Sequence, residues 1–164
     1  IVTNDGAMAA LKEDGAVITW GDEDCGGDSS TVREQLSEGV THIVTTLEAM
    51  AALKENGAVV TWGIAGHGGD NSAVREQLTE GVTQIKTTNL AMAAIKENGA
   101  VVTWGGDGDG DSSAVREQLT EDVANISSSM RSFVARKADG SVVCWGNAPN
   151  PSQEIQEALQ SGIS

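Results

Sequence analysis

The chain has 164 residues, with ten Lys and Arg against 24 Asp and Glu and a formal net charge of −14 at pH 7. This charge excludes nucleic acids and anionic membranes as favoured partners, because binding to phosphates depends on Lys and Arg, and it favours protein partners with a basic surface. The length fits a single domain, and no apolar run reaches the roughly 20 residues that a membrane span needs, so no direct membrane span is expected.

A repeat organises the whole chain. Its most regular segment runs from Met8 to Gly21 and returns at 50–63, at 92–105 and, in divergent form, at 133–146. A fixed period of this kind indicates a repeat architecture. We predict one repeat domain over 1–164, with units at about 5–46, 47–88, 89–129 and 130–164, the last closing with residues 1–4. The tryptophans that end the segments are predicted to be structural core residues: Trp20, Trp62, Trp104 and Trp145.

The first half of each unit predicts a β-hairpin. In the first unit, an apolar run over 7–12 and a β-branched run over 16–20 flank the pair Asp14-Gly15. Asp-Gly or Asn-Gly between two such runs is the strongest short-range hairpin signal, and in the two-residue turn both residues adopt positive φ. The pair returns at 56–57, 98–99 and 139–140.

The second half predicts a Gly- and Asp-rich loop, a short helix and a third strand. The helix is expected at 30–36, 72–78 and 113–119, with Ser30, Ser72 and Ser113 as N-caps. The third strand is expected at 40–46, 82–88 and 123–128. The chain begins inside such a strand and ends at the start of another, so pairing of the two ends could close a ring and remove exposed sheet edges.

The fold class is therefore mainly β: a four-unit β-propeller-like ring of hairpin-bearing blades, each with a short helix. An open segment of a longer propeller and an elongated stack are the alternatives.

The segment Ala-Leu-Lys-Glu-Asp-Gly-Ala-Val-Ile-Thr-Trp-Gly, preceded by a Val-x-x-Ile strand, resembles the regulator-of-chromosome-condensation (RCC1) repeat. The resemblance covers essentially the whole chain and implies a β-propeller, usually with more blades and longer repeats than here. Members of that family are exchange factors for small GTPases, chromatin binders, ultraviolet receptors and protein-interaction platforms. The resemblance implies the scaffold and no particular activity, since fold does not imply function.

Residues that recur in every unit are interpreted as structural, so candidates for function are those that occur once. No serine or cysteine has a base nearby in sequence, so no catalytic residue and no cofactor are expected. Asp107, Asp109 and Asp111 alternate like the first ligands of a calcium loop. Ser112 and Gln118, however, stand where that loop needs Gly and Glu, so a solvated turn is favoured over a metal site.

Five residues depart from the repeat and are candidates for protein contacts: Ile64, His67, Met130, Arg131 and Arg136. Cys25 and Cys144 occupy unrelated positions of the repeat, so two free thiols are favoured over a single disulfide.

These observations favour a non-enzymatic, acidic protein-interaction or scaffold module, a structural subunit of a larger assembly. The alternative is a calcium- or ligand-binding module that uses the Asp/Gly loops. Similar short repeats in proteins of photosynthetic protists suggest a remoter alternative, an accessory subunit of a photosynthetic membrane complex. The start at Ile1 without Met indicates either a fragment or a processed mature form, and the second would suggest a secreted or organelle-lumen protein.

Overall fold

The computed structural model describes residues 1–147 and 151–160. In this part of the chain, short strands form four separate three-stranded antiparallel sheets. Sheet 1 contains β1 (Val2–Thr3), β2 (Ala7–Leu11) and β3 (Val17–Gly21), and sheet 2 contains β4 (Val40–Thr45), β5 (Ala49–Lys54) and β6 (Val59–Gly63). Sheet 3 contains β7 (Val82–Thr87), β8 (Ala91–Lys96) and β9 (Val101–Gly105), and sheet 4 contains β10 (Val123–Ser128), β11 (Ser132–Lys137) and β12 (Val142–Gly146).

Each sheet combines parts of two neighbouring sequence repeats. The strand that ends one repeat pairs with the hairpin of the next, as β4 does when Val44 pairs with Ala51 of β5. The hairpin then adds its second strand, with Met50 opposite Trp62. The same register returns in the other sheets, where Met8 lies opposite Trp20 and Met92 opposite Trp104.

The hairpins are present at all four predicted positions, but their turns are longer than expected. Lys12 N donates to Ala16 O at 2.9 Å and Gly15 N donates to Lys12 O at 3.1 Å, so three residues, 13–15, form the loop. Gly15 has a φ of 77°, whereas Asp14 does not reach positive φ. Asp14 instead accepts the N–H of Ala16 with Oδ1. The expectation of positive φ at both residues was wrong, because the turn is the three-residue type with a left-handed glycine.

The predicted short helices are present as 3₁₀-helices: η2 (Ser30–Val32), η4 (Ser72–Leu78) and η5 (Ser113–Leu119). The prediction of Ser30, Ser72 and Ser113 as N-caps was wrong, because each is the first helical residue. An aspartate two residues earlier accepts the backbone N–H of each serine: Asp28, Asp70 and Asp111. Further short turns are η1 (Glu23–Gly27) and η3 (Ala65–His67), and α1 (Gln153–Gln160) follows sheet 4.

The hydrophobic core consists of layers between neighbouring sheets. Between sheets 2 and 3, for example, Ala51 and Leu53 of β5 pack with Met92 and Trp104 of sheet 3. Equivalent layers lie between sheets 1 and 2 and between sheets 3 and 4. Alternate residues of a strand point to opposite faces, so a sheet between two neighbours buries both faces. This explains why the middle strands β5 and β8 are apolar at nearly every position.

Backbone and indole hydrogen bonds also join neighbouring sheets. Trp62 Nε1 donates to Gly26 O at 3.0 Å, and Trp104 Nε1 donates to Gly68 O at 3.1 Å. Lys54 Nζ donates to Gln35 O at the end of the preceding repeat's helical segment. The first two loops after Trp-Gly pairs therefore contact the following sheet.

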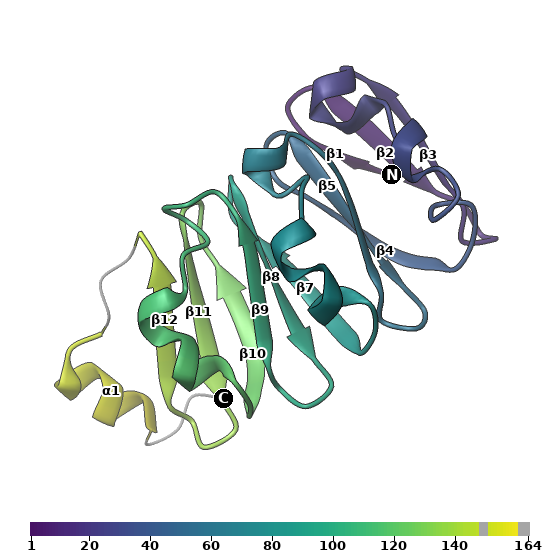
Figure 1. The fold of residues 1–164 in the computed structure, drawn as a ribbon. Coiled ribbons are helices and arrows are strands. Elements are labelled where there is room, and N and C mark those ends of the chain that lie inside the picture. The colour runs from purple at the N-terminus through teal and green to yellow at the C-terminus, as the bar shows by residue number, and fades with distance from the viewer. Residues whose placement is uncertain (148–150, 161–164) are drawn as a thin grey trace.

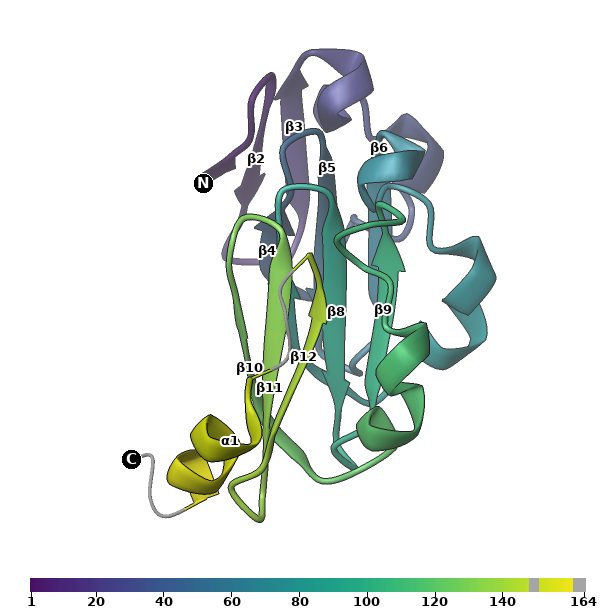
Figure 2. The same ribbon diagram turned by 90° about the vertical axis from the view of Figure 1, so that its left-hand side faces the viewer.

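The four sheets follow one another, and sheets 1 and 4 lie at opposite ends of the molecule (Figure 1). The short 3₁₀-helices lie along the side of β3, β6 and β9, whereas α1 lies apart from them (Figure 2). The mainly β, propeller-like repeat fold is confirmed. The predicted closure involves residues 162–164, which lie outside the described residues, and the arrangement of the described sheets corresponds to the open alternative.

Candidate interaction surfaces

A groove of about 400 Å³ lies where the first and second loops after Trp-Gly meet. Three carboxylates line it, from Glu23, Asp24 and Asp28, and Trp62 and Ile64 add apolar atoms. Glu23 and Asp24 belong to η1, a turn that Asp22 holds by accepting the N–H of Asp24 at 3.0 Å. We call this feature the rim groove. Glu23 and Asp24 have no acidic counterpart in the second loop, which has Ala65 and Gly66 at the matching positions.

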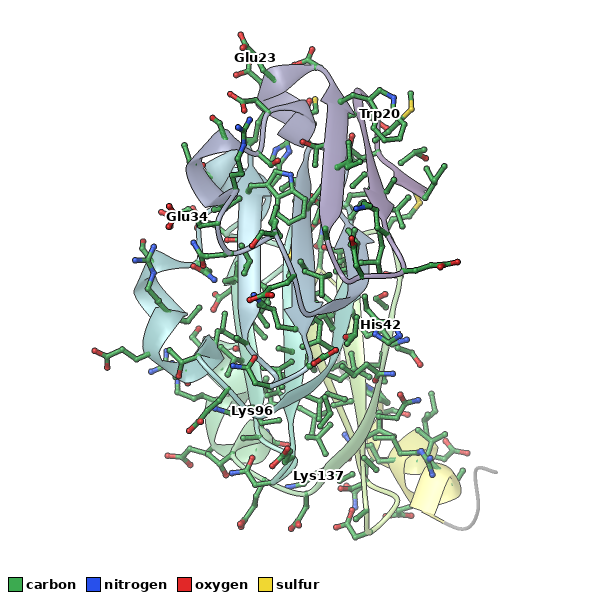
Figure 3. The ribbon with its side chains drawn as sticks, turned by 90° about the vertical axis from the view of Figure 1, so that its right-hand side faces the viewer. Trp20, Glu23, Glu34, His42, Lys96 and Lys137 are labelled. Atoms are coloured by element: carbon green, nitrogen blue, oxygen red, sulfur yellow. The ribbon has the colours of Figure 1, made fainter. Side chains whose placement is uncertain are left out.

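One carboxylate of the rim groove, that of Asp28, is stabilised in its ionised form. Hydrogen bonds from the backbone N–H and hydroxyl of Ser30 lower the pKa of Asp28. Glu23 and Asp24 form no salt bridge with any residue that the structure describes. Figure 3 shows Glu23 projecting outward from the end of the molecule. The groove therefore offers unpaired negative charge beside apolar atoms.

Two of the predicted contact residues, Ile64 and His67, lie at the second loop, but only Ile64 lines the rim groove. His67 Nδ1 lies 2.7 Å from Glu48 Oε2. The same nitrogen makes no hydrogen bond of good geometry with any described residue, so the contact is a close approach of the two side chains. His67 also accepts, with its backbone oxygen, a hydrogen bond from Thr46. These contacts hold the second loop against the turn between β4 and β5. Glu48 was not among the predicted residues.

Arg131 joins sheet 4 to the third loop. Its Nε lies 3.3 Å from Oδ1 of Asp109, a side chain that is 1% exposed. Asp109 occupies the repeat position of Gly26 and Gly68, in a loop that is one residue shorter. Asp109 Oδ2 and Trp145 Nε1 are both buried without a hydrogen-bond partner in the described structure. The indole-to-carbonyl bond of the earlier repeats is therefore absent here.

The three aspartates proposed as calcium ligands do not converge. Asp109 is buried against Arg131, whereas Asp111 accepts the N–H of Ser113. Among the described residues, no group of three His, Cys, Asp or Glu side chains could hold a metal ion. Asp111 is the solvated turn residue that the sequence favoured, and Asp109 is not.

The remaining predicted contact residues, Met130 and Arg136, are exposed at sheet 4. Arg136 stands in β11 where the earlier hairpins have Leu11, Leu53 and Ile95. It therefore lies on the face of sheet 4 that has no following sheet within the described chain. Val134, two residues earlier on the same face, is also exposed.

Trp20 differs from the other three tryptophans. It is 41% exposed, whereas Trp62, Trp104 and Trp145 are at most 7% exposed. Figure 3 shows it on sheet 1, at the surface of the molecule. The prediction that all four are core residues was wrong for Trp20, because no sheet of the described structure covers this face of sheet 1. Met8 and Ile18 on the same face are also exposed, and the sequence pattern gave no reason to separate them from their buried counterparts.

Cys25 and Cys144 are both free and buried. Burial raises the pKa of both thiols, and the carboxylates of Asp22 and Glu48 raise that of Cys25 further. The predicted free thiols are thus present as packing residues. Within the described part of the chain, no helix is long and apolar enough to cross a membrane.

No protein-family model matches this chain, and no curated protein sequence matches it either. Solved structures do match. Human WBSCR16 has a TM-score of 0.60 at 15% identity, over 90% of this chain and 48% of that chain. Prp20p of Saccharomyces cerevisiae, described with its binding to Gsp1p and histones, has a TM-score of 0.59 at 20% identity, over 87% of this chain and 43% of that chain.

The CRINKLY WD40 ectodomain of the Arabidopsis thaliana receptor kinase ACR4 has a TM-score of 0.56 at 18% identity, over 92% of this chain and 52% of that chain. The chain thus spans about half the length of these proteins. At such identities the likeness concerns the fold alone, and it supports the RCC1-like propeller fold that the repeat implied.

Proposed function

We propose that this chain is a non-enzymatic protein-interaction module, a structural subunit of a larger assembly, which binds a basic protein surface at its rim groove. The observation that carries the proposal is the unpaired charge of Glu23 and Asp24 beside Ile64 and the edge of Trp62. A Lys or Arg side chain suits such a groove, because its aliphatic stem contacts apolar atoms while its charged end meets carboxylates. The net charge of −14 adds long-range attraction for the same partner.

The scaffold supports this function in a second way. Loops differ between repeats while the sheets stay the same, as the acids of the first loop and the Ala-Gly of the second show. Variable loops on a rigid scaffold are a common location of binding residues. The fold neighbour Prp20p binds proteins according to its description, which is consistent with a protein partner here. Its binding to Gsp1p and histones is not carried over to this chain.

The direct test is zero-length carbodiimide cross-linking in a native extract, which joins carboxylates to lysines of a bound protein. We expect cross-links to map to Glu23 and Asp24. A defined probe completes the test: a Lys-rich peptide should bind the chain, and should bind Glu23→Gln/Asp24→Asn at least about threefold more weakly, with a smaller salt dependence.

The matched control is Glu34→Gln/Glu38→Gln, which removes the same charge away from the groove. Glu34 projects from another side of the molecule in Figure 3. If both double variants weaken the peptide equally, net charge alone explains the binding and the rim groove is not the site.

A further inference from the structure

Sheet 1 exposes a face that the chain buries three times elsewhere. Five apolar positions form this face in every repeat, and in sheet 2 they are Ile43, Met50, Ala52, Val60 and Trp62. In sheet 4 all five are at most 4% exposed: Ile126, Phe133, Ala135, Val143 and Trp145. In sheet 1 the large residues at these positions are exposed: Ile1 by 86%, Met8 by 39%, Ile18 by 54% and Trp20 by 41%. We call these residues, with Ala10, the head face.

The three internal interfaces show what covers such a face. The preceding sheet contributes alternate residues of its middle strand, so Leu11 lies in the same apolar layer as Trp62, Leu53 in that of Trp104, and Ile95 in that of Trp145. The matching residues of sheet 4 are Val134 and Arg136 of β11, which we call the tail face. Both are exposed, whereas Cys144 and Val142, which lie opposite them on β12, are buried. The helix α1 lies on the outer side of sheet 4 (Figure 1).

The backbone gives the stack a direction. Asp5 N donates to Leu47 O, Leu47 N to Asn89 O, and Asn89 N to Met130 O, at 3.1, 2.9 and 2.8 Å. Within the described chain, this series of backbone hydrogen bonds ends with the N–H of Met130 at the tail and the carbonyl of Asp5 at the head. A donor meets an acceptor only when a tail faces a head, because two heads would oppose two carbonyls.

The charges of the two ends are complementary as well. Residues 1–36 contain eight Asp and Glu against two Lys and Arg, whereas residues 123–147 contain three Lys and Arg against the single Asp139. Of these three, Arg131 pairs with Asp109, and α1 adds Glu154 and Glu157. A tail therefore attracts a head, while two heads repel each other.

We propose that the head face binds the tail face of a second copy of this chain, and that two copies close into a ring by forming this junction twice. The chain spans about half the length of the solved propellers that share its fold, so two copies supply the span of one. A two-fold axis relates the two junctions, and closure leaves no apolar face uncovered. The inference is independent of the rim groove.

Arg136 has a specific place in this junction. Its repeat position always shares an apolar layer with the tryptophan of the next sheet. In the junction it reaches Trp20 of the other copy, where a guanidinium stacks on an indole face in a cation–π contact. This accounts for an arginine at a position where three repeats have Leu or Ile.

The test begins with the mass of the chain in solution by light scattering. We expect twice 16.9 kDa at micromolar concentration. Trp20 provides a local signal, because it is the one described tryptophan with an exposed indole. Its emission should shift to the blue as concentration rises, and Trp20→Phe should remove that shift.

Variants then separate the two faces. Ile18→Lys at the head and Arg136→Glu at the tail should each weaken the dimer at least about tenfold, whereas Gln118→Lys, on the exposed surface of η5, should not. Both altered residues are exposed in the single chain, and far-ultraviolet circular dichroism checks that each variant folds. Mixing the head and tail variants restores one intact junction, so a heterodimer should form.

The proposal is overturned if the chain stays monomeric at all concentrations, or if it grows into a series of larger oligomers. It is also overturned if Arg136→Glu leaves the dimer intact while Ile18→Lys dissociates it, since that result means head-to-head pairing.

Discussion

Arg131 and Asp109 form an ion pair between sheet 4 and the third loop, with Nε 3.3 Å from Oδ1. The pair replaces two uncharged residues, because Leu90 and Gly68 stand at the matching positions one repeat earlier. Asp109 is almost fully buried, so its carboxylate depends on Arg131 for compensation. Arg131 itself is largely exposed, which moderates the strength of the pair.

Loss of Arg131 should therefore destabilise the fold. We expect Arg131→Leu to lower the free energy of unfolding by about 1–2 kcal/mol, because a buried carboxylate loses its partner. The double variant Asp109→Gly/Arg131→Leu, which restores the residues of the preceding repeat, should recover most of this loss. Urea denaturation measures both. Arg33→Leu is the control for loss of an exposed arginine, and equal effects of the two single variants would contradict this role of the pair.

Asp122 is a second departure from the repeat with a measurable cost. It has a φ of 64°, whereas the equivalent Gly39 and Gly81 adopt 70° and 73° without a side-chain penalty. Asp122→Gly should stabilise the protein by up to about 1 kcal/mol and raise the Tm by a few degrees. Gly81→Asp should do the reverse, since a Cβ there meets only Lys96 Cε at 3.7 Å and the effect is confined to the backbone. Thermal unfolding of both variants decides the point.

Acidification should weaken the turns that begin the 3₁₀-helices. Hydrogen bonds from Ser30, Ser72 and Ser113 lower the pKa values of Asp28, Asp70 and Asp111 below the ordinary 3.8. A lowered folded pKa contributes stability that is fully present above the unfolded value and is lost as pH falls through the folded value.

The matched variant for this prediction is Asp28→Asn/Asp70→Asn/Asp111→Asn, because an amide oxygen accepts the same N–H but does not titrate. The stability of the wild type relative to this variant should fall between about pH 5 and about pH 2. Urea midpoints at several pH values measure the difference. A constant difference would show that these carboxylates contribute no pH dependence.

Calcium should leave the protein unchanged. Asp109 pairs with Arg131, and Asp111 accepts a hydrogen bond from the N–H of Ser113. Asp107 therefore has no second carboxylate with which to bind an ion. We expect millimolar calcium to shift the Tm by less than about 1 °C, since a ligand stabilises only in proportion to its binding. Calorimetric titration of the wild type and of Asp107→Asn should give the same trace. Saturable heat that disappears in the variant would restore the calcium-binding alternative.

Repetition made the sheets and their order predictable, because four copies of one hairpin signal reinforce each other. The details that failed depend on context that a single copy does not contain. Asp14-Gly15 fits either a two- or a three-residue turn, and the pairing of Leu11 with Val17 selects the longer one. Ser30 was predicted as the N-cap, but it is the first helical residue, and Asp28 accepts its N–H because an Asp side chain can bond to the backbone two residues on.

The candidate sites were less predictable, since they depend on which neighbour a residue meets. Trp20 ends nearly the same hairpin sequence as Trp62, but no sheet of the described structure lies in front of it. Asp109 resembled a calcium ligand, and only the placement of Arg131 shows it to be an ion-pair partner. Arg131 and Arg136 were singled out because they break the repeat, and both lie at boundaries of sheet 4.

Because the apolar layers lie between the sheets, a sheet has little to stabilise it alone. Energetically the molecule is close to a linear array with nearest-neighbour coupling, so its ends should open before its middle. If one whole 42-residue repeat were inserted or removed, each remaining sheet would still pack against a neighbouring sheet with the same sequence pattern. Gene segments of this type can thus change the number of blades without redesign of any contact.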